Sequence, residues 1–446
     1  MVSLFLILLA VNNTRHKEPY HAGEDFWYPL DNAAKIFPAV KSHELTTVFR
    51  LSAVLKQRVK ISHPQIAIHA MEERFPYFKV KLKKGFFWFY LEHINVPISL
   101  EFDNGIPCRE FNQNDQNKLM FRILAVNNRI SIEFSHIITD GTAAFCFLKT
   151  LLSLYFEQEG VDIPAGCDDI LPDSLLLEDE FEDSYKRYFK EDIPLNQRLS
   201  KAFHLPYPLR EKPRFDVLIA IVPLDEIKNK AREKGVSITV YLIAVYMFIL
   251  QDIYRSLDKS GHYRKSEKLR IQVPINLRNI YPSKTMRNFS LFVIPEIDLR
   301  LGFYEFDEIL KIVFHKLELE TEEKVINKII ARNVGSEKKL FVRGIPLFIK
   351  SMILAFKYYS MGTSQYSGVI TNLGKVHFAP EIDKRIEYCI FTPPPPDRNL
   401  KLNCGVIGCN DKLVLSFGNI TSGKEFERKF LHFLNREGIN VRLTKY

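Results

Sequence analysis

Ser135-His-Ile-Ile-Thr-Asp-Gly141 is the stretch of sequence that decides how the rest of the chain is interpreted. It follows two apolar runs, at 121–126 and 130–134, which predict a β-hairpin. Beyond Gly141 apolar residues recur at helical spacing, which predicts a helix. The stretch is therefore expected to be a loop between a strand and a helix, and loops held by rigid elements often carry functional side chains.

His136 and Asp140 are the residues of this loop with useful chemistry. A histidine with an ordinary pKa can accept a proton from a hydroxyl or amine at neutral pH, and a general base contributes about 10²–10⁴-fold to a rate. Asp140 could orient the imidazole, or it could pair with an arginine and hold the loop shape behind Gly141. Spacing alone does not decide between these roles. A loop histidine followed by a turn aspartate also occurs by chance.

Composition predicts a globular protein of two packed units. The chain has 446 residues, of which 46% are hydrophobic and 26% charged. Its six cysteines form no C-x-x-C pair, which favours a reducing, cytoplasmic location. The formal charge of +9 is spread along the chain without a nucleic-acid motif, so it indicates attraction of a small anionic ligand.

Several other functional classes lose their usual support. The sequence has no G-x-S-x-G, Walker A or G-x-G-x-x-G motif, which are typical of hydrolases, P-loop enzymes and dinucleotide-binding proteins. A metal pair of His136 and Asp140 would lack a third ligand nearby, so no metal is expected. The sequons at Asn12, Asn288 and Asn419 are interpreted as chance triplets, because no signal peptide accompanies them.

Strands and helices alternate in both halves of the chain, which predicts an α/β fold. We expect an N-terminal arm at 1–24, a first subdomain at 25–160, a proline-rich crossover linker at 161–213 and a second subdomain at 214–446.

Four local features add to this outline. The apolar run at 2–11 is too short to span a bilayer, so any membrane contact is expected to be weak and to use the N-terminus. A hairpin at 78–91 is expected to turn at Gly85 with a positive φ. The acidic cluster at 178–183 is expected to be a solvated face. The helix at 237–254 is apolar nearly all round and should be buried.

The motif and several longer stretches resemble the chloramphenicol acetyltransferase-like superfamily, which includes plant BAHD acyltransferases and peptide-synthetase condensation domains. The resemblance is closest to the bacterial alcohol acetyltransferase-like branch. It covers the chain from about residue 25 to the C-terminus, in the family's order. Besides the motif, the stretches that carry it are Trp27-Tyr-Pro-Leu-Asp-Asn-Ala-Ala-Lys-Ile-Phe-Pro38, Glu73-Arg-Phe-Pro-Tyr-Phe78, Lys84-Gly-Phe-Phe-Trp88, Val273-Pro-Ile-Asn-Leu-Arg278 and Gly368-Val-Ile-Thr-Asn-Leu-Gly374.

The resemblance implies a pseudo-dimer of two α/β subdomains, each a two-layer α+β sandwich, with a tunnel between them. It also implies an acyltransferase that moves an acetyl or longer acyl group from acyl-CoA to an alcohol, sugar or amine. His136 would be the general base in a direct attack. Acyl-CoA would be a co-substrate, with no bound cofactor, and a monomer would be sufficient.

The resemblance also assigns roles to residues far from the motif. Asp140 becomes structural and pairs with Arg278, and Gly141 closes the loop. Asn372 and Thr371 are the candidates for contacting substrate or the oxyanion. Conceivable contacts for the CoA phosphates are Lys284, Arg287 and Lys375, although each is more simply interpreted as a surface cation.

The sequence departs from parts of the family pattern. Ser135 replaces the first histidine of the double-histidine motif of condensation domains, which favours a CoA donor. The D-F-G-W-G motif of the plant enzymes is absent, so their substrates do not carry over. Two alternatives stay open: a carrier-protein-dependent transferase of natural-product biosynthesis, and a non-catalytic member of the fold.

Overall fold

The structure is a computed structural model that describes residues 26–40, 46–111, 118–163, 170, 174–191, 199–258 and 266–446. The expected N-terminal arm, the sequon at Asn12 and parts of the expected linker lie outside the described residues.

The strands run in chain order as β1 (Trp27–Pro29), β2 (Val48–Leu55), β3 (Val80–Lys84), β4 (Phe89–His93), β5 (Leu100–Phe102), β6 (Phe121–Val126), β7 (Arg129–Ser135), β8 (Asp216–Pro223), β9 (Lys268–Asn276), β10 (Ser290–Val293), β11 (Glu296–Asp298), β12 (Gly368–Val376), β13 (Ile386–Thr392), β14 (Leu402–Cys409), β15 (Lys412–Asn419) and β16 (Arg442–Thr444). The helices are α2 (Phe37–Val40), α3 (Ser62–Met71), α4 (Gly141–Gln158), α5 (Ser184–Arg187), α6 (Leu224–Glu233), α7 (Ile238–Asp258), α8 (Phe306–Thr321), α9 (Glu323–Lys338), α10 (Leu340–Gly344), α11 (Leu347–Lys357), α12 (Pro380–Asp383) and α13 (Glu425–Arg436).

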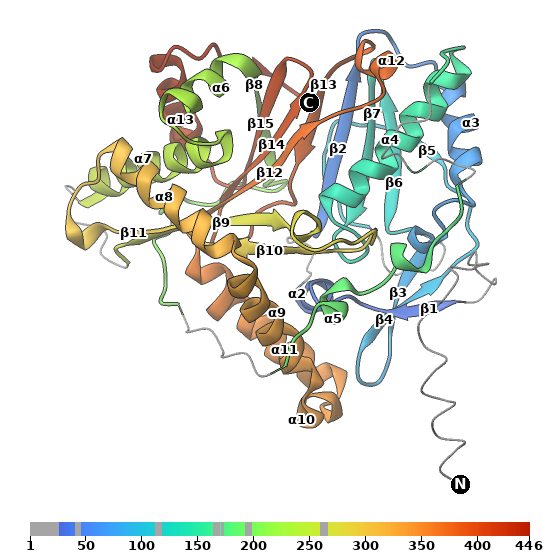
Figure 1. Ribbon diagram of the computed structural model, residues 1–446, viewed down its shortest axis with the longest axis horizontal. Coiled ribbons are helices and arrows are strands. Elements are labelled where there is room, and N and C mark those ends of the chain that lie inside the picture. The colour runs from blue at the N-terminus through green and yellow to red at the C-terminus, as the bar shows by residue number, and fades with distance from the viewer. Residues whose placement is uncertain are drawn as a thin grey trace, which may run out of the picture.

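The first half is built on a sheet with the strand order β13-β2-β7-β6-β5. The predicted hairpin is β6–β7, and its turn contains Asn127 with a positive φ of 50°, which asparagine tolerates better than most residues. Helices α3 and α4 pack together over this sheet, on the right of Figure 1. Every residue of β2 is buried, so this strand is the centre of the first core.

The second half is built on a larger sheet with the order β10-β9-β12-β14-β15-β8-β16, in which β11 also pairs with β9. Helix α7 packs against β9 and α13, with Tyr241 to Met247 fully buried, so the prediction of a buried helix is confirmed. Among the described residues, Ile238–Leu257 is the one helix long and apolar enough to cross a membrane by length and composition. Most of it is packed into the second core, as expected for a core helix.

One strand of the second half belongs to the sheet of the first half, which the sequence did not indicate. Strand β13 comes from the range assigned to the second subdomain, but it pairs antiparallel with β2 in the first sheet (Figure 1). It also packs against β14 and β15 of the second sheet. A strand that follows an ordinary apolar pattern can complete either sheet, so periodicity could not reveal which one it joins. The mixed α/β fold with a sheet in each half agrees with the predicted fold class.

Two local expectations were wrong. Gly85 does not have a positive φ. It is needed because a Cβ there would lie 2.7 Å from the Trp88 carbonyl oxygen, which accepts a hydrogen bond from the Gly85 amide. The acidic cluster is not simply a solvated face, because Glu180 is buried and its two oxygens each accept a 2.8 Å hydrogen bond from Arg74.

Candidate active site

The motif loop lies between the end of β7 and the start of α4, as the sequence predicts. The His136 backbone amide donates to the Thr47 carbonyl at 2.9 Å, which fixes the chain just beyond the strand. Ser135 is buried, and its hydroxyl lies 2.9 Å from that of Thr47. The residue that replaces the first histidine of the double-histidine motif is therefore part of the loop's internal support.

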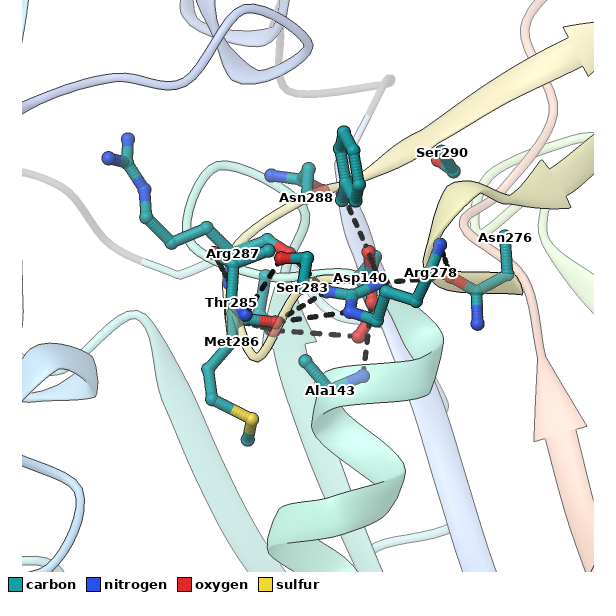
Figure 2. Close-up of polar contacts among 12 residues, drawn as sticks. Asp140, Ala143, Asn276, Arg278, Ser283, Thr285, Met286, Arg287, Asn288 and Ser290 are labelled. Carbon is teal, nitrogen blue, oxygen red and sulfur yellow. Dashed lines mark hydrogen bonds and ion pairs between the residues drawn. The ribbon is translucent and has the colours of Figure 1, made fainter. Parts of the chain in front are cut away.

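Asp140 is held on all sides and points away from solvent. One carboxylate oxygen accepts from the Ala143 amide at 3.0 Å and caps helix α4. The other accepts from Arg278 Nη1 and from the Phe289 amide, both at 2.8 Å (Figure 2). This carboxylate ties α4 to the chain around β9 and β10, which is an architectural task.

Arg278 is similarly saturated. Besides its ion pair with Asp140, its guanidinium donates to the carbonyl oxygens of Thr285 and Arg287, each at 2.7 Å from Nη2 (Figure 2). Its Nη1 also lies 3.2 Å from the side-chain oxygen of Asn276. One arginine therefore shapes the loop at 277–289 and attaches it to the motif, which requires the planar, forked donor set of arginine.

Gly141 marks the place where the two halves meet. It is the first residue of α4, and a Cβ there would lie 3.0 Å from Leu373 Cδ2 of β12 and 3.8 Å from the Phe391 ring of β13. Glycine allows the motif loop to approach the second sheet closely.

His136 lies among aromatic rings and remains partly accessible. The imidazole centroid is 4.5 Å from that of Phe49 and 5.7 Å from that of Phe37, which stacks on it. Burial lowers the pKa of His136 below its ordinary 6.5, although a hydrogen bond with Asn288 and the charge of Asp140 act in the opposite direction. The imidazole is therefore neutral at neutral pH, which is the state that a general base requires.

Asn288 is the residue that orients this imidazole, and sequence reasoning missed it. Its amide nitrogen donates to the His136 carbonyl at 2.9 Å and to Asp31 Oδ2 at 3.0 Å. Because both of these partners are acceptors, the amide oxygen must be the atom that faces His136 Nδ1, at 3.4 Å. Nδ1 then carries the hydrogen, and the lone pair is left on Nε2.

Asp31 anchors Asn288 from a fully buried position. Its other carboxylate oxygen accepts from the Ala34 amide at 2.8 Å, and Arg287 Nε lies 3.7 Å from Oδ2. Burial raises the pKa of Asp31 to about 6, with Arg287 lowering it and Asp183 raising it. The only signal in the sequence was that Asp31 lies within one of the stretches that resemble the superfamily and Asn288 within a sequon.

Arg287 is not the surface cation that the sequence favoured, and it is not available for a phosphate either. It is buried, and its guanidinium donates to the carbonyl oxygens of Pro29 and Phe181, at 2.6 and 3.2 Å. Phe181 belongs to the expected linker. A second hydrogen bond joins the same segment to the loop, because the Thr285 hydroxyl donates to the Glu182 carbonyl oxygen at 2.8 Å. The linker thus braces the loop that carries Arg278 and Asn288.

Thr371 and Asn372 lie on opposite faces of β12. Asn372 donates to the Thr239 hydroxyl of the helix layer at 2.9 Å and accepts from the Gly374 amide at 2.8 Å. Thr371 pairs with Gly405, where a Cβ would meet the Phe391 carbonyl oxygen of β13 at 2.4 Å. Thr371 therefore shares the face turned toward the first half, and Asn372 is used inside the second half.

Of the remaining cations, Lys375 lies beside a cavity and Lys284 is exposed. The cavity has a volume of about 550 Å³ and lies where α6 and the start of α7 approach β12. Lys228 and Arg232 also line it, together with Asp225 and Asp411. Within the described ranges, no three His, Cys, Asp or Glu side chains gather as a metal site.

Comparison with known proteins identifies the fold. No protein-family model matches the chain, and no curated protein matches it in sequence. The nonribosomal peptide synthetase FmoA3 superposes with a TM-score of 0.59 at 12% identity, over 96% of this chain and 44% of the FmoA3 chain. This chain therefore spans less than half of that protein.

Two shorter proteins match over nearly their whole length. The epimerization domain of the third module of tyrocidine synthetase B gives a TM-score of 0.57 at 11% identity, covering 95% of this chain and 97% of that one. TRI3 trichothecene 15-O-acetyltransferase from Fusarium sporotrichioides gives 0.57 at 11%, covering 95% and 99%. The fold is thus the pseudo-dimeric fold of condensation domains and chloramphenicol acetyltransferase-like proteins. At these identities the alcohol acetyltransferase branch is not distinguished.

Proposed function

We propose that this protein is an acyltransferase that moves an acyl group from a thioester to a hydroxyl or amine acceptor, with His136 as the general base. The observation that carries the proposal is the hydrogen bonding of His136, whose Nδ1 faces Asn288 and whose Nε2 is left to accept a proton. The neutral, partly accessible imidazole among Phe37 and Phe49 fits this task.

In the proposed reaction, Nε2 takes the proton of the acceptor as its oxygen or nitrogen attacks the thioester carbonyl. The tetrahedral intermediate then collapses, the carbon–sulfur bond breaks, and the thiolate receives the proton from His136. The acyl group passes directly to the acceptor, so no acyl-enzyme forms. Asp140 and Arg278 keep the loop in place and exchange no proton.

The developing oxyanion needs a hydrogen-bond donor, and Thr371 is better placed than Asn372 for this role. Its hydroxyl forms no hydrogen bond with any residue that the structure describes, and its strand face is turned toward the motif half. Both polar atoms of Asn372 are already bonded to Thr239 and Gly374.

An acyl-CoA is the proposed donor. Lys375, Lys228 and Arg232 around the cavity could bind the CoA phosphates, and their three positive charges exceed the two negative charges of Asp225 and Asp411. Lys375 lies two residues beyond Leu373, which contacts the motif at Gly141. The second candidate is a carrier-protein thioester, which the resemblance to the peptide-synthetase structures favours.

The test is release of free thiol from a panel of acyl-CoA and acyl-carrier donors with alcohol, amine and sugar acceptors. We expect His136→Ala to lower the rate by about 10²–10⁴-fold, the usual contribution of a general base. His69→Ala, at an exposed histidine of α3, is the matched control and should keep the wild-type rate.

Three outcomes would count against parts of the proposal. An unchanged rate in a folded His136→Ala protein would refute the mechanism. An acyl-enzyme trapped in mass spectrometry would refute direct transfer. Thiol release from carrier donors alone would replace acyl-CoA by the second candidate.

A further inference from the structure

Helix α11 buries a charged side chain and exposes large apolar ones, the reverse of an ordinary surface helix. Its buried residues are Leu347 and Lys350, whereas Phe348, Met352 and Phe356 are 70%, 72% and 70% exposed. These three lie four residues apart, so they form one stripe along the helix. Large apolar side chains on the exposed face of a helix indicate that this face binds an apolar partner.

Lys350 is held firmly in its inward position. Its ammonium lies 3.6 Å from the centre of the Trp88 ring and donates to the carbonyl oxygens of Phe87 and Arg343, at 3.0 and 3.2 Å. Burial, with the nearby charge of Lys35, lowers the pKa of Lys350. The orientation of the helix is therefore fixed by bonded contacts, and its apolar stripe is turned outward as a result.

The turn between β3 and β4 extends the apolar stripe. The Leu347 amide donates to the Phe86 carbonyl at 2.9 Å, which joins the start of α11 to the tip of the hairpin. Phe86 and Phe87 at this tip are 72% and 43% exposed. In Figure 1, α10, α11 and the hairpin lie together at the lower edge of the molecule, below the two larger sheets. We call the six side chains Phe86, Phe87, Phe348, Met352, Ile353 and Phe356 the apolar face.

The two chain segments that carry the apolar face contain charges of one sign only. The sequence has no Asp or Glu between Glu73 and Glu92, nor between Glu337 and Glu381. Lys84, Arg343 and Lys357 are exposed there, and none of them forms an ion pair with a residue that the structure describes. Such a surface combines apolar insertion with cationic attraction, the two signals that together give stable binding to an anionic bilayer.

We propose that the apolar face docks this protein on an anionic lipid bilayer. A second copy of the chain fits less well, because pairing two such faces would bring their unpaired cations together. Large aromatic side chains with lysine and arginine beside them are typical of residues at the membrane–water interface. Helix α11 also packs against α2, whose Phe37 stacks on His136, so docking would hold the candidate active site near the lipid surface.

The experiment is flotation of the full chain with vesicles of phosphatidylcholine, with and without phosphatidylglycerol. We expect binding to the anionic vesicles that weakens with salt. The triple variant Lys84→Glu, Arg343→Glu and Lys357→Glu should weaken it by about a hundredfold, from the usual contribution of each cation near an anionic surface.

A second triple variant, Phe348→Ser, Met352→Ser and Phe356→Ser, should weaken binding by at least about tenfold. The double variant Leu301→Ser and Leu319→Ser, at residues that are 80% and 60% exposed elsewhere, is its matched control and should bind like wild type. These residues are exposed, so the fold should tolerate the changes, and circular dichroism checks this.

The proposal would be overturned by wild-type protein that does not float with anionic vesicles. Binding that the serine variant leaves intact would also overturn it. A dimer in analytical ultracentrifugation that the serine variant dissociates would assign the apolar face to a second copy. None of these readouts requires enzymatic activity, so they are independent of the proposed acyl transfer.

Discussion

Asp140 and Asp31 are both buried near His136, and they differ in how completely they are paired. Asp140 accepts a hydrogen bond from Arg278 at 2.8 Å and one from each of two backbone amides. Asp31 is fully buried, but its nearest cation, Arg287, lies 3.7 Å away. The first therefore fixes the loop, whereas the second, through Asn288, reaches the base itself. The carboxylate within the motif is thus the architectural one, and the one behind the base lies outside it.

Removing the ion-pair partner of Asp140 should have the largest effect on stability. In Arg278→Ala the carboxylate stays buried without its ion partner, and three carbonyl-directed hydrogen bonds of the loop are lost. We expect the free energy of unfolding to fall by about 3–5 kcal/mol, the usual cost of removing one partner of a buried pair. Acyl transfer should fall as well.

Arg300→Ala is the control for this prediction, because Arg300 is exposed and pairs with Asp298 at the surface. Its effect in urea unfolding should be small, because water and salt screen an exposed ion pair. Equal stability of the Arg278 and Arg300 variants would show that Asp140 does not depend on its arginine.

Removing Asn288, which links Asp31 to His136, should change the rate more than the stability. Asn288→Ala leaves His136 Nδ1 without its oriented acceptor, so we expect kcat to fall by about 10- to 100-fold, as for residues that orient a functional histidine. Asn419→Ala removes another buried asparagine, whose amide nitrogen donates to the Gly423 carbonyl at 3.0 Å and to Glu427 of α13 at 2.7 Å. The Asn419 variant should lose a similar amount of stability and keep its kcat. Equal values of kcat in the two variants would remove Asn288 from the mechanism.

The smallest effect is the pH dependence of stability that Asp31 contributes. Its pKa is about 6 in the folded protein, above the ordinary 3.8. Between these values the folded chain keeps a proton that the unfolded chain has released, so the free energy of unfolding falls as the pH rises through this window. One proton gives a slope of at most about 1.4 kcal/mol per pH unit.

Urea unfolding at a series of pH values measures this slope. It should be reduced in Asp31→Asn and retained in Asp162→Asn, a change at an exposed aspartate. The same slope in all three proteins would show that Asp31 titrates normally.

The sequence predicted those parts of the molecule that depend on neighbouring residues or on a distinctive motif. The β6–β7 hairpin, the start of α4 and buried α7 follow from local patterns. The Asp140–Arg278 ion pair followed from the resemblance. Only the superfamily's fold, and not the branch within it, is shown by the structural comparisons.

The remaining features depend on contacts between distant segments. Asn288 has no signature of its own, because an asparagine becomes an orienting group only where the fold brings Asp31 and His136 beside it. The pairing of β13 with β2 and the burial of Glu180 on Arg74 are likewise tertiary events. Local periodicity contains no information about them.

The most direct test of the account is ¹⁵N NMR of histidine-labelled protein, with the His136 signals assigned by their loss in His136→Gln. We predict a neutral imidazole at neutral pH, with its hydrogen on Nδ1, that becomes protonated with a pKa below 6.5. Loss of the preference for Nδ1–H in Asn288→Ala would sharpen the assignment. An imidazolium at neutral pH, or a hydrogen on Nε2, would contradict the assignment of His136 as the base.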